Sequence, residues 1–228
     1  MKSGTLKKPG RDEVLLKPFI VNEIFLSIQG ETSLSGLPTV FIRLTGCPLR
    51  CRYCDTAYAF DAGAKMTLAD ILATVASFRT RQVTVTGGEP LAQKNCLELL
   101  QQLCDEGYQV SLETSGAIDV AAVDTRVIKI LDLKTPGSGE MARNRYENLE
   151  FLLPHDEIKF VICDRADYEW CKCKLAEYRL TDRCQILFSG SHEQLPAREL
   201  ADWILADRLP VRLQIQLHKY LWGDVPGR

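Results

Sequence analysis

Three cysteines lie close together in the sequence, at Cys47, Cys51 and Cys54, with the spacing C-x3-C-x2-C. They follow an apolar run over residues 40–44 and a glycine, Gly46. A 4Fe–4S cluster is held by cysteine thiolates, normally four of them. A local group of three thiolates can hold three irons and leave the fourth open, where a small molecule can be ligated and given an electron. The spacing therefore predicts an iron–sulfur cluster with one open iron.

A structural zinc site is the main alternative for these thiols. Such a site needs four ligands, usually as two separated pairs. The histidines are scattered at positions 155, 192 and 218, and the cysteines have no partner pair. Cys171 and Cys173 are two residues apart on a predicted helix, so their side chains face different directions and a second metal site is not favoured. Zinc is therefore the weaker interpretation.

The composition is that of an ordinary soluble globular protein, with 46% apolar and 25% charged residues among 228. The formal net charge of -2 gives no electrostatic reason to expect nucleic acid or a membrane as partner. The chain has no apolar run long enough for a transmembrane helix, and its charged N-terminus lacks the apolar segment of a secretory signal. Nine cysteines, an odd number, argue against a disulfide framework. We therefore expect a cytoplasmic protein, with four cysteines buried as apolar side chains: Cys96, Cys104, Cys163 and Cys184.

Strands and helices alternate along most of the chain. An extended apolar stretch over 21–29 precedes seven predicted strands, at 39–44, 82–86, 109–113, 127–133, 157–163, 184–188 and 211–217. Helices are predicted over 67–78, 91–106, 144–153, 166–180 and 193–206. This order predicts an α/β fold with a parallel sheet, right-handed crossovers and flanking helices. The chain is short for eight βα units, so a partial, open barrel fits better.

Residues 1–18 are polar and contain Gly and Pro, and we predict a loosely ordered N-terminal arm followed by a single domain over 19–228. Within that domain, the polar and glycine-rich segments fall at the C-terminal ends of the predicted strands. They are the cysteine loop and residues 87–90, 113–116, 132–139 and 188–192. Ligand sites in parallel α/β folds form at that edge of the sheet. We therefore expect these loops to converge on the cluster.

The cysteine motif, followed by Thr86-Gly-Gly-Glu-Pro90 at a strand end, resembles the radical S-adenosylmethionine (SAM) superfamily. The resemblance implies a (β/α)6-type radical SAM barrel, in which the open iron chelates SAM and one-electron reduction yields a 5′-deoxyadenosyl radical. Gly88 would let the backbone approach the methionine moiety, which a Cβ would obstruct. Tyr53, between the last two cysteines, matches the usual aromatic position and could pack near the adenine, although ordinary loop packing is an equal alternative.

The segment over 22–60 resembles the 7-carboxy-7-deazaguanine synthase family. The resemblance rests on E-I-F-x-S-I-Q-G-E, on a G-x-P turn and on F-I-R-L-x-G-C-P-x-x-C-x-x-C-D-T, and it recurs at VTGGEP, LETSG, DLK, EIKFVI and residues 217–220. It implies that 6-carboxy-5,6,7,8-tetrahydropterin becomes 7-carboxy-7-deazaguanine with loss of ammonia, in queuosine or other 7-deazapurine biosynthesis, while SAM is regenerated. It also implies Mg2+ on Thr56, an external one-electron reductant of flavodoxin or ferredoxin type, and a homodimer.

The same resemblance assigns further site residues. Substrate contacts carry over to Ile28, Gln29, Gly30, Arg43, Thr86, Glu113 and His218. Contacts with SAM carry over to Ser115, Asp132, Leu133 and Lys134, with Ser189-Gly190-Ser191 as an additional candidate. Many members have Ser-Pro-Lys where this chain has Asp132-Leu-Lys134, which puts a serine hydroxyl contact in doubt.

The proposed substrate contacts agree with the chemistry of a carboxylated pterin. A carboxylate such as Glu113 and an amide such as Gln29 can hydrogen-bond an aminopyrimidinone edge, and Arg43 can bind a carboxylate through two parallel bonds. Each has a plainer alternative: a surface or interface arginine for Arg43, a helix-capping carboxylate for Glu113, and a packed strand-end histidine for His218. The rival functions are a glycyl-radical enzyme activase, which shares the cysteine and GGEP motifs, and a non-enzymatic metal-binding module.

Overall fold

The computed structural model describes residues 14–192, 194–223, 225 and 227. Within these residues, nine strands form one sheet in the order β3-β1-β2-β4-β5-β6-β7-β8-β9. The strands are β1 (Pro18–Ile28), β2 (Pro38–Leu44), β3 (Ala64–Thr67), β4 (Gln82–Gly87), β5 (Gln109–Thr114), β6 (Ile128–Asp132), β7 (Glu157–Ile162), β8 (Gln185–Gly190) and β9 (Arg212–Gln214). The α-helices are α2 (Leu68–Ser77), α3 (Cys96–Asp105), α4 (Arg165–Tyr178), α5 (Ala197–Asp207) and α6 (Leu217–Trp222).

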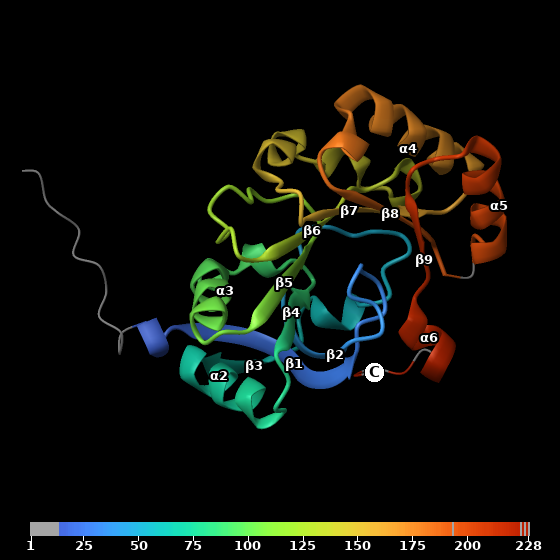
Figure 1. Ribbon diagram of the computed structural model, residues 1–228. Helices are drawn as coiled ribbons and strands as arrows, with labels where there is room; N and C mark the ends of the chain where they lie inside the picture. Colours follow the sequence, from blue (N-terminus) through green and yellow to red (C-terminus); the bar gives the residue numbers. More distant parts are fainter. Residues whose placement is uncertain (1–13, 193, 224, 226, 228) are drawn as a thin grey trace, which may run out of the picture.

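The sheet is parallel from β2 through β9, as predicted, but its other edge is antiparallel. β1 pairs antiparallel with both β2 and β3, so the extended stretch near the N-terminus joins the sheet in the opposite direction. The reason is the short connection over 29–37, because a parallel pair needs a crossover of a dozen or more residues. Figure 1 shows the sheet curving into an open arc with α2, α3, α4 and α5 on its outer side.

The predicted helices agree with the structure in part. A capping box between Thr67 and Asp70 opens α2, as the sequence indicates, and Asp164 caps α4. The helix predicted over 91–106 is shorter, because a 3-10 turn, η2 (Pro90–Ala92), precedes α3. The helix predicted over 144–153 is wrong in type: it is the 3-10 helix η5 (Tyr146–Phe151). The remaining 3-10 helices are η1 (Ala57–Ala59), η3 (Pro136–Ser138), η4 (Met141–Arg143) and η6 (Leu180–Asp182).

Both ends of the chain differ from the prediction. The last strand, predicted to end at Leu217, ends at Gln214; residues 215 and 216 connect it to α6, which begins at Leu217. The expected arm lies mostly outside the described residues. Its last part is not loose, because Val14 and Leu15 pack against the core and Lys17 forms an ion pair with Glu98.

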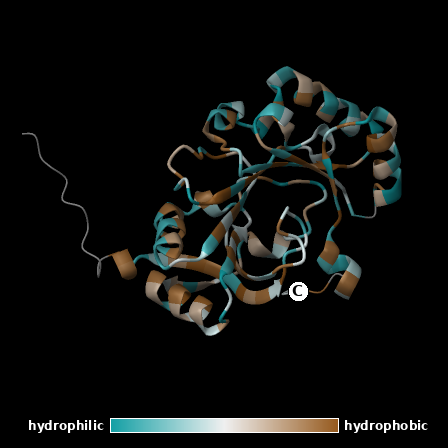
Figure 2. Ribbon diagram, viewed as in Figure 1, coloured by the Kyte–Doolittle hydropathy of each residue, from teal (hydrophilic) through white to brown (hydrophobic). Residues whose placement is uncertain are grey.

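The core lies between the sheet and the outer helices. Leu68, Ile71 and Val75 of α2 are fully buried, and in Figure 2 hydrophobic and hydrophilic residues alternate along the helices. This packing fixes the strands and leaves their C-terminal ends free to carry polar loops. Within the described residues, none of the helices is long and apolar enough to cross a membrane.

Candidate active site

A cavity of about 670 Å³ lies at the C-terminal ends of the strands. Its walls include all but one of the predicted site residues: Ile28, Gln29, Gly30, Arg43, Cys47, Cys51, Tyr53, Cys54, Thr56, Thr86, Gly88, Glu113, Ser115, Asp132, Lys134 and His218. Ser189, Gly190 and Ser191 also line it. The exception is Leu133, whose side chain is buried in the core, so the structure leaves only its backbone for contact with a ligand.

The three predicted cluster ligands reach this cavity as half-buried free thiols. Their loop is fixed by Gly46, which has a positive φ of 101° and donates a backbone hydrogen bond to the carbonyl of Ala59 at 2.9 Å. Burial raises the pKa of the Cys47 thiol. It raises the pKa of Cys51 to about 11, against the opposing charge of Lys134. Both thiols are thus protonated at neutral pH, and metal ligation must release their protons.

The donor chemistry of the loop fits an iron–sulfur cluster. Among the described residues, no group of three or more His, Cys, Asp or Glu side chains is arranged to hold a single metal ion. The thiolates of a 4Fe–4S cluster each bind a different iron, so they stand further apart than ligands of one ion. Cys47, Cys51 and Cys54 supply three thiols to one cavity, which is the donor set that a cluster with one open iron needs.

The two glycines after β4 allow close packing against the cysteine loop. A Cβ on Gly87 would overlap the carbonyl of Leu44, and one on Gly88 would lie 2.8 Å from the Cβ of Cys47. Hydrogen bonds run across the same contact, from Gly88 N to Leu44 O at 3.2 Å and from Glu89 N to Gly46 O at 2.8 Å. In this structure the glycines therefore have a further reason, close packing against the cysteine loop; the approach of Gly88 to SAM stays a prediction.

Glu89 connects the ends of β4 and β5, a role that sequence reasoning missed. Its carboxylate is fully buried and accepts hydrogen bonds from Thr114 Oγ1 at 2.9 Å and from Ser115 N at 2.7 Å. The hydroxyl of Ser115 also donates to it. Ser115 is thus held in place by the GGEP loop. The sequence feature that could have indicated this role is an acidic residue, Glu89, inside the turn-forming motif GGEP.

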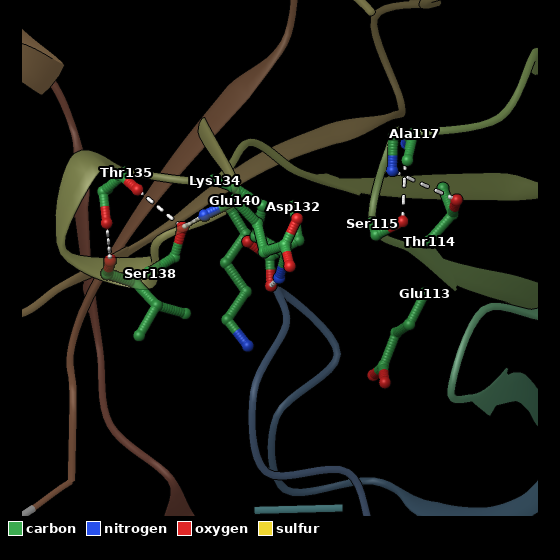
Figure 3. A network of polar contacts seen from close by, with 12 residues as sticks. Glu113, Thr114, Ser115, Ala117, Asp132, Lys134, Thr135, Ser138 and Glu140 are labelled. Carbon is green, nitrogen blue, oxygen red and sulfur yellow. Dashed lines mark hydrogen bonds and ion pairs between the residues drawn. The ribbon is translucent and has the colours of Figure 1, made fainter. Parts of the chain in front are cut away.

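The end of β6 carries Asp132 and Lys134, which form an ion pair of 2.9 Å. Figure 3 shows Lys134 and Glu113 extending in the same direction from the ends of neighbouring strands. Two buried polar atoms in this wall lack a hydrogen-bond partner among the described residues: Asp132 Oδ1 and the hydroxyl of Tyr53. A buried polar atom without a partner is costly, so this wall is suited to a polar ligand such as SAM.

In the same cavity as the cysteines, Gln29, Thr86 and Glu113 form a hydrogen-bonded group. Gln29 Nε2 donates to Glu113 Oε1 at 3.3 Å, and Thr86 Oγ1 donates to Glu113 Oε2 at 2.9 Å. Burial, followed by the charge of Glu31, raises the pKa of Glu113. Glu113 lies within β5 and faces the cavity, so the helix-capping alternative is wrong.

Arg43 is held between two aromatic rings and an acid. Its Nε donates to Glu23 Oε1 at 2.7 Å, and its guanidinium lies 5.8 Å from the ring centroids of Phe25 and Tyr58. Tyr58 also donates to Glu23 at 2.9 Å. Arg43 is therefore oriented by the neighbouring strand while it lines the cavity, which is an interior position and not a surface one.

The C-terminal segment closes the cavity through polar contacts that sequence reasoning did not find. Lys159 of β7 forms an ion pair with Glu31, which also accepts from Gln216 Nε2 at 2.9 Å. Lys219 binds Asp55 at 2.9 Å. Burial acts to raise the pKa of Asp55, but the hydrogen bond and charge of Lys219 outweigh it and hold that pKa below its usual range.

His218 and Thr56 lie beside this network. His218 belongs to α6 and not to a strand end, with its Nε2 3.8 Å from Glu31. A Cβ on Gly30 would lie 2.7 Å from His218 Nδ1, which accounts for glycine at that position. The hydroxyl of Thr56 donates to Asp55 Oδ1 at 2.8 Å, so its oxygen lone pairs remain available as ligands.

Comparisons with known proteins agree with this geometry. The Radical SAM superfamily profile matches residues 41–133. The 7-carboxy-7-deazaguanine synthase of Chlorobaculum tepidum is 47% identical, with 90% of this chain and 95% of the relative covered. The enzyme of the same name from Koribacter versatilis is 42% identical, with 89% and 96% covered.

Solved structures are similar as well. The crystal structure of QueE from Escherichia coli superposes with a TM-score of 0.73 at 25% identity, covering 87% of this chain and 94% of that one. Streptococcus suis SuiB shares the fold, with a TM-score of 0.53 at 14% identity, covering 75% of this chain and 46% of that one. The predicted partial radical SAM barrel is confirmed. The chain therefore belongs to the 7-carboxy-7-deazaguanine synthase family of radical SAM enzymes.

Proposed function

We propose that this enzyme converts 6-carboxy-5,6,7,8-tetrahydropterin to 7-carboxy-7-deazaguanine with loss of ammonia. One observation carries the proposal: the three thiols and the hydrogen-bonded group of Gln29, Thr86 and Glu113 line the same cavity. Family membership brings a 4Fe–4S cluster and SAM. When bound, this pair supplies a 5′-deoxyadenosyl radical that abstracts hydrogen from the substrate.

The hydrogen-bonded group of Gln29, Thr86 and Glu113 would orient the pterin. Glu113 can accept hydrogen bonds from the amino group and ring N–H of an aminopyrimidinone, because its carboxylate is an acceptor at both oxygens. Gln29 and Thr86 already donate to it and hold both oxygens in position. Ile28 and Gly30, in the same cavity, leave room for a flat ring.

Arg43 and Thr56 would act on the substrate carboxylate. The Nε of Arg43 is engaged by Glu23, and its Nη groups can donate to a carboxylate. Mg2+ prefers an octahedron of oxygen ligands and keeps waters or substrate oxygens among them. The hydroxyl of Thr56, beside the negatively charged Asp55, is a suitable single protein ligand. His218 would border the substrate from α6.

Lys134 and Tyr53 would act on the SAM side. The unpartnered Tyr53 hydroxyl and Asp132 Oδ1 offer a donor and an acceptor to the polar groups of SAM. Gly88 and Ser115 line the wall between them and the pterin site. The reductant would be a flavodoxin or ferredoxin, and the enzyme would be a homodimer. It would lie in the cytoplasm; the nine free cysteines support this location.

The proposal is tested with enzyme reconstituted anaerobically with iron and sulfide. Incubation with carboxytetrahydropterin, SAM and a chemical reductant is expected to give a deazaguanine chromophore without net consumption of SAM. Stoichiometric use of SAM with no new chromophore, and a modified glycine in a partner protein, would identify an activase instead. A colourless protein that retains zinc would contradict both enzymes.

Replacing Thr56 tests the metal assignment separately. In Thr56→Ala, the stimulation of turnover by Mg2+ is expected to fall by about tenfold, because one oxygen ligand and its orientation are lost. Thr56→Ser keeps the hydroxyl and is the matched control. An unchanged Mg2+ dependence in Thr56→Ala would refute the role of this residue while leaving the reaction itself standing.

A further inference from the structure

The loop after β6 contacts the cysteine loop on both sides of Cys51. We call residues 135–140 the brace. Its Ser138 carbonyl accepts from Arg52 N at 3.0 Å, and its Glu140 carboxylate accepts from Arg50 N at 2.7 Å. Arg50 and Arg52 are the two chain neighbours of Cys51. The backbone amides before and after this cysteine are therefore both fixed by the brace.

The brace is ordered by its own hydrogen bonds. The hydroxyl of Ser138 donates to the carbonyl of Thr135 at 2.6 Å and accepts from Glu140 N at 3.0 Å. Thr135, Ser138 and Glu140 lie together at one side of Figure 3. Gly139 closes the turn with a positive φ of 79°, a conformation that favours glycine.

Asp167 of α4 anchors the brace to the sheet. Its buried carboxylate accepts from Gly137 N at 2.8 Å and from Cys163 N, at the end of β7, at 3.0 Å. A Cβ on Gly137 would lie 2.9 Å from Cys163 Sγ, so the contact tolerates no side chain there. Thr135 adds a bond from its hydroxyl to the carbonyl of Val161 at 2.9 Å. These bonds fix the brace relative to β7 and α4.

The brace also continues from the wall proposed for SAM. Lys134 directly precedes it, with its backbone held by Asn144 through two bonds of 2.9 Å. One continuous segment thus carries both the SAM wall and the support of the middle cysteine.

We propose that the brace positions Cys51 for cluster ligation, and that Glu140 and Asp167 are positioning residues for the cluster. Neither residue touches the thiols, so both act through the backbone of the cysteine loop. The inference rests on the proposed assignment of Cys47, Cys51 and Cys54 as cluster ligands. A brace of this kind would slow the release of iron, because the thiolate of Cys51 could not swing away from the cluster.

The test measures how fast the reconstituted enzyme, without SAM or substrate, loses its visible cluster absorbance to an iron chelator. Glu140→Ala is expected to lose iron about fivefold to tenfold faster than wild type, because one bond to a charged acceptor is removed. Glu140→Gln keeps an acceptor oxygen and is expected to stay within about twofold of wild type. Glu150→Ala, an exposed acid on η5, is the matched control and should not change the rate.

Asp167→Asn tests the anchor. An amide presents one oxygen and one donor, so either Gly137 N or Cys163 N would face a donor, and faster iron loss is expected again. Thermal melting of each apoprotein separates loosening of the brace from loss of the fold.

Equal rates of iron loss in Glu140→Ala and wild type would overturn the proposal, whatever the rate in Asp167→Asn. If Glu140→Ala and Glu140→Gln lose iron equally faster than wild type, the charge of Glu140 matters and its hydrogen bond to Arg50 N does not, which would overturn the proposal. A wild-type protein that holds no cluster would instead refute the ligand assignment.

Discussion

Glu31 and Glu113 line the same cavity, yet their pKa values move in opposite directions. Burial raises the pKa of Glu113, whose bonding partners are the neutral groups of Gln29 and Thr86. Burial acts on Glu31 in the same way, but the charge of Lys159 outweighs it and lowers that pKa. Neutral donors therefore do not offset desolvation here, whereas one ammonium group in contact does. Glu31 is committed to a partner within the protein, and Glu113 remains available to a ligand.

Removing the positive charge of Lys159 should have the largest effect on stability. Lys159→Met leaves the carboxylate of Glu31 without its ion-pair partner and is expected to lower the free energy of unfolding by about 2 kcal/mol. Such a loss is below the value for a fully buried pair, because both side chains retain some exposure. Urea unfolding of the apoprotein measures this change.

A surface pair provides the control for that experiment. Lys172 contacts Glu169 and Asp207 on the outer helices, and Lys172→Met is expected to cost less than about 1 kcal/mol. If both lysine variants lose the same stability, the distinction between the cavity pair and a surface pair is wrong.

Removing the charge of Glu113 should act on the substrate and less on the fold. Glu113→Gln is expected to reduce kcat/KM for the pterin by about tenfold to a hundredfold, since one of two acceptor oxygens becomes a donor. Glu147→Gln, an exposed acid far from the cavity wall, is the matched control. Full activity in Glu113→Gln would show that this carboxylate does not bind the ligand.

The pH dependence of unfolding should give the smallest effect and the sharpest contrast. A raised folded-state pKa means that the stability contributed by protonated Glu113 is present below the ordinary value of 4.5 and is lost as pH rises through the folded pKa. The lowered pKa of Glu31 means that its contribution is present above 4.5 and is lost as pH falls through the folded pKa. Urea unfolding of Glu113→Gln and Glu31→Gln against wild type should therefore show differences that change with pH in opposite senses. Parallel pH profiles would contradict the comparison.

Much of the site could be predicted because its residues belong to short local sequence motifs. The cysteine motif, GGEP and the strand ends are local patterns, and a parallel sheet brings the C-terminal ends of its strands to one edge. That rule predicts that the thiols, Thr86 and Glu113 lie near one another, whereas Gln29 follows the antiparallel strand β1 and its place in the site was predicted from the family resemblance alone. The antiparallel direction of β1 has a different signal, the short connection over 29–37, because a parallel pair needs a longer crossover. The alternation of strands and helices, from which the parallel sheet was predicted, does not contain that signal.

The ion pairs Lys159–Glu31 and Lys219–Asp55 belong to no local sequence motif. Lys159 and Glu31 are separated by 128 positions, and Lys219 and Asp55 by 164. The contact of Lys219 depends on α6, whose first residue, Leu217, the sequence predicted as the end of a strand. Apolar residues over 211–217 favour a strand by composition, whereas the structure turns the chain at Gln216 so that His218 and Lys219 face the cavity. Side-chain partners across such distances follow from the tertiary fold.

The contacts of Gly30 have a consequence for synthesis of the protein. Its carbonyl accepts from Gln214 Nε2 at 3.1 Å and from Leu217 N at 3.2 Å, so one wall of the cavity is made by residues translated after the strand-end loops. A ribosome stalled before Gln214 would carry a chain whose cysteine loop and central strands are complete but whose substrate pocket is open on that side. Formation of the closed pocket must therefore wait until α6 has left the exit tunnel.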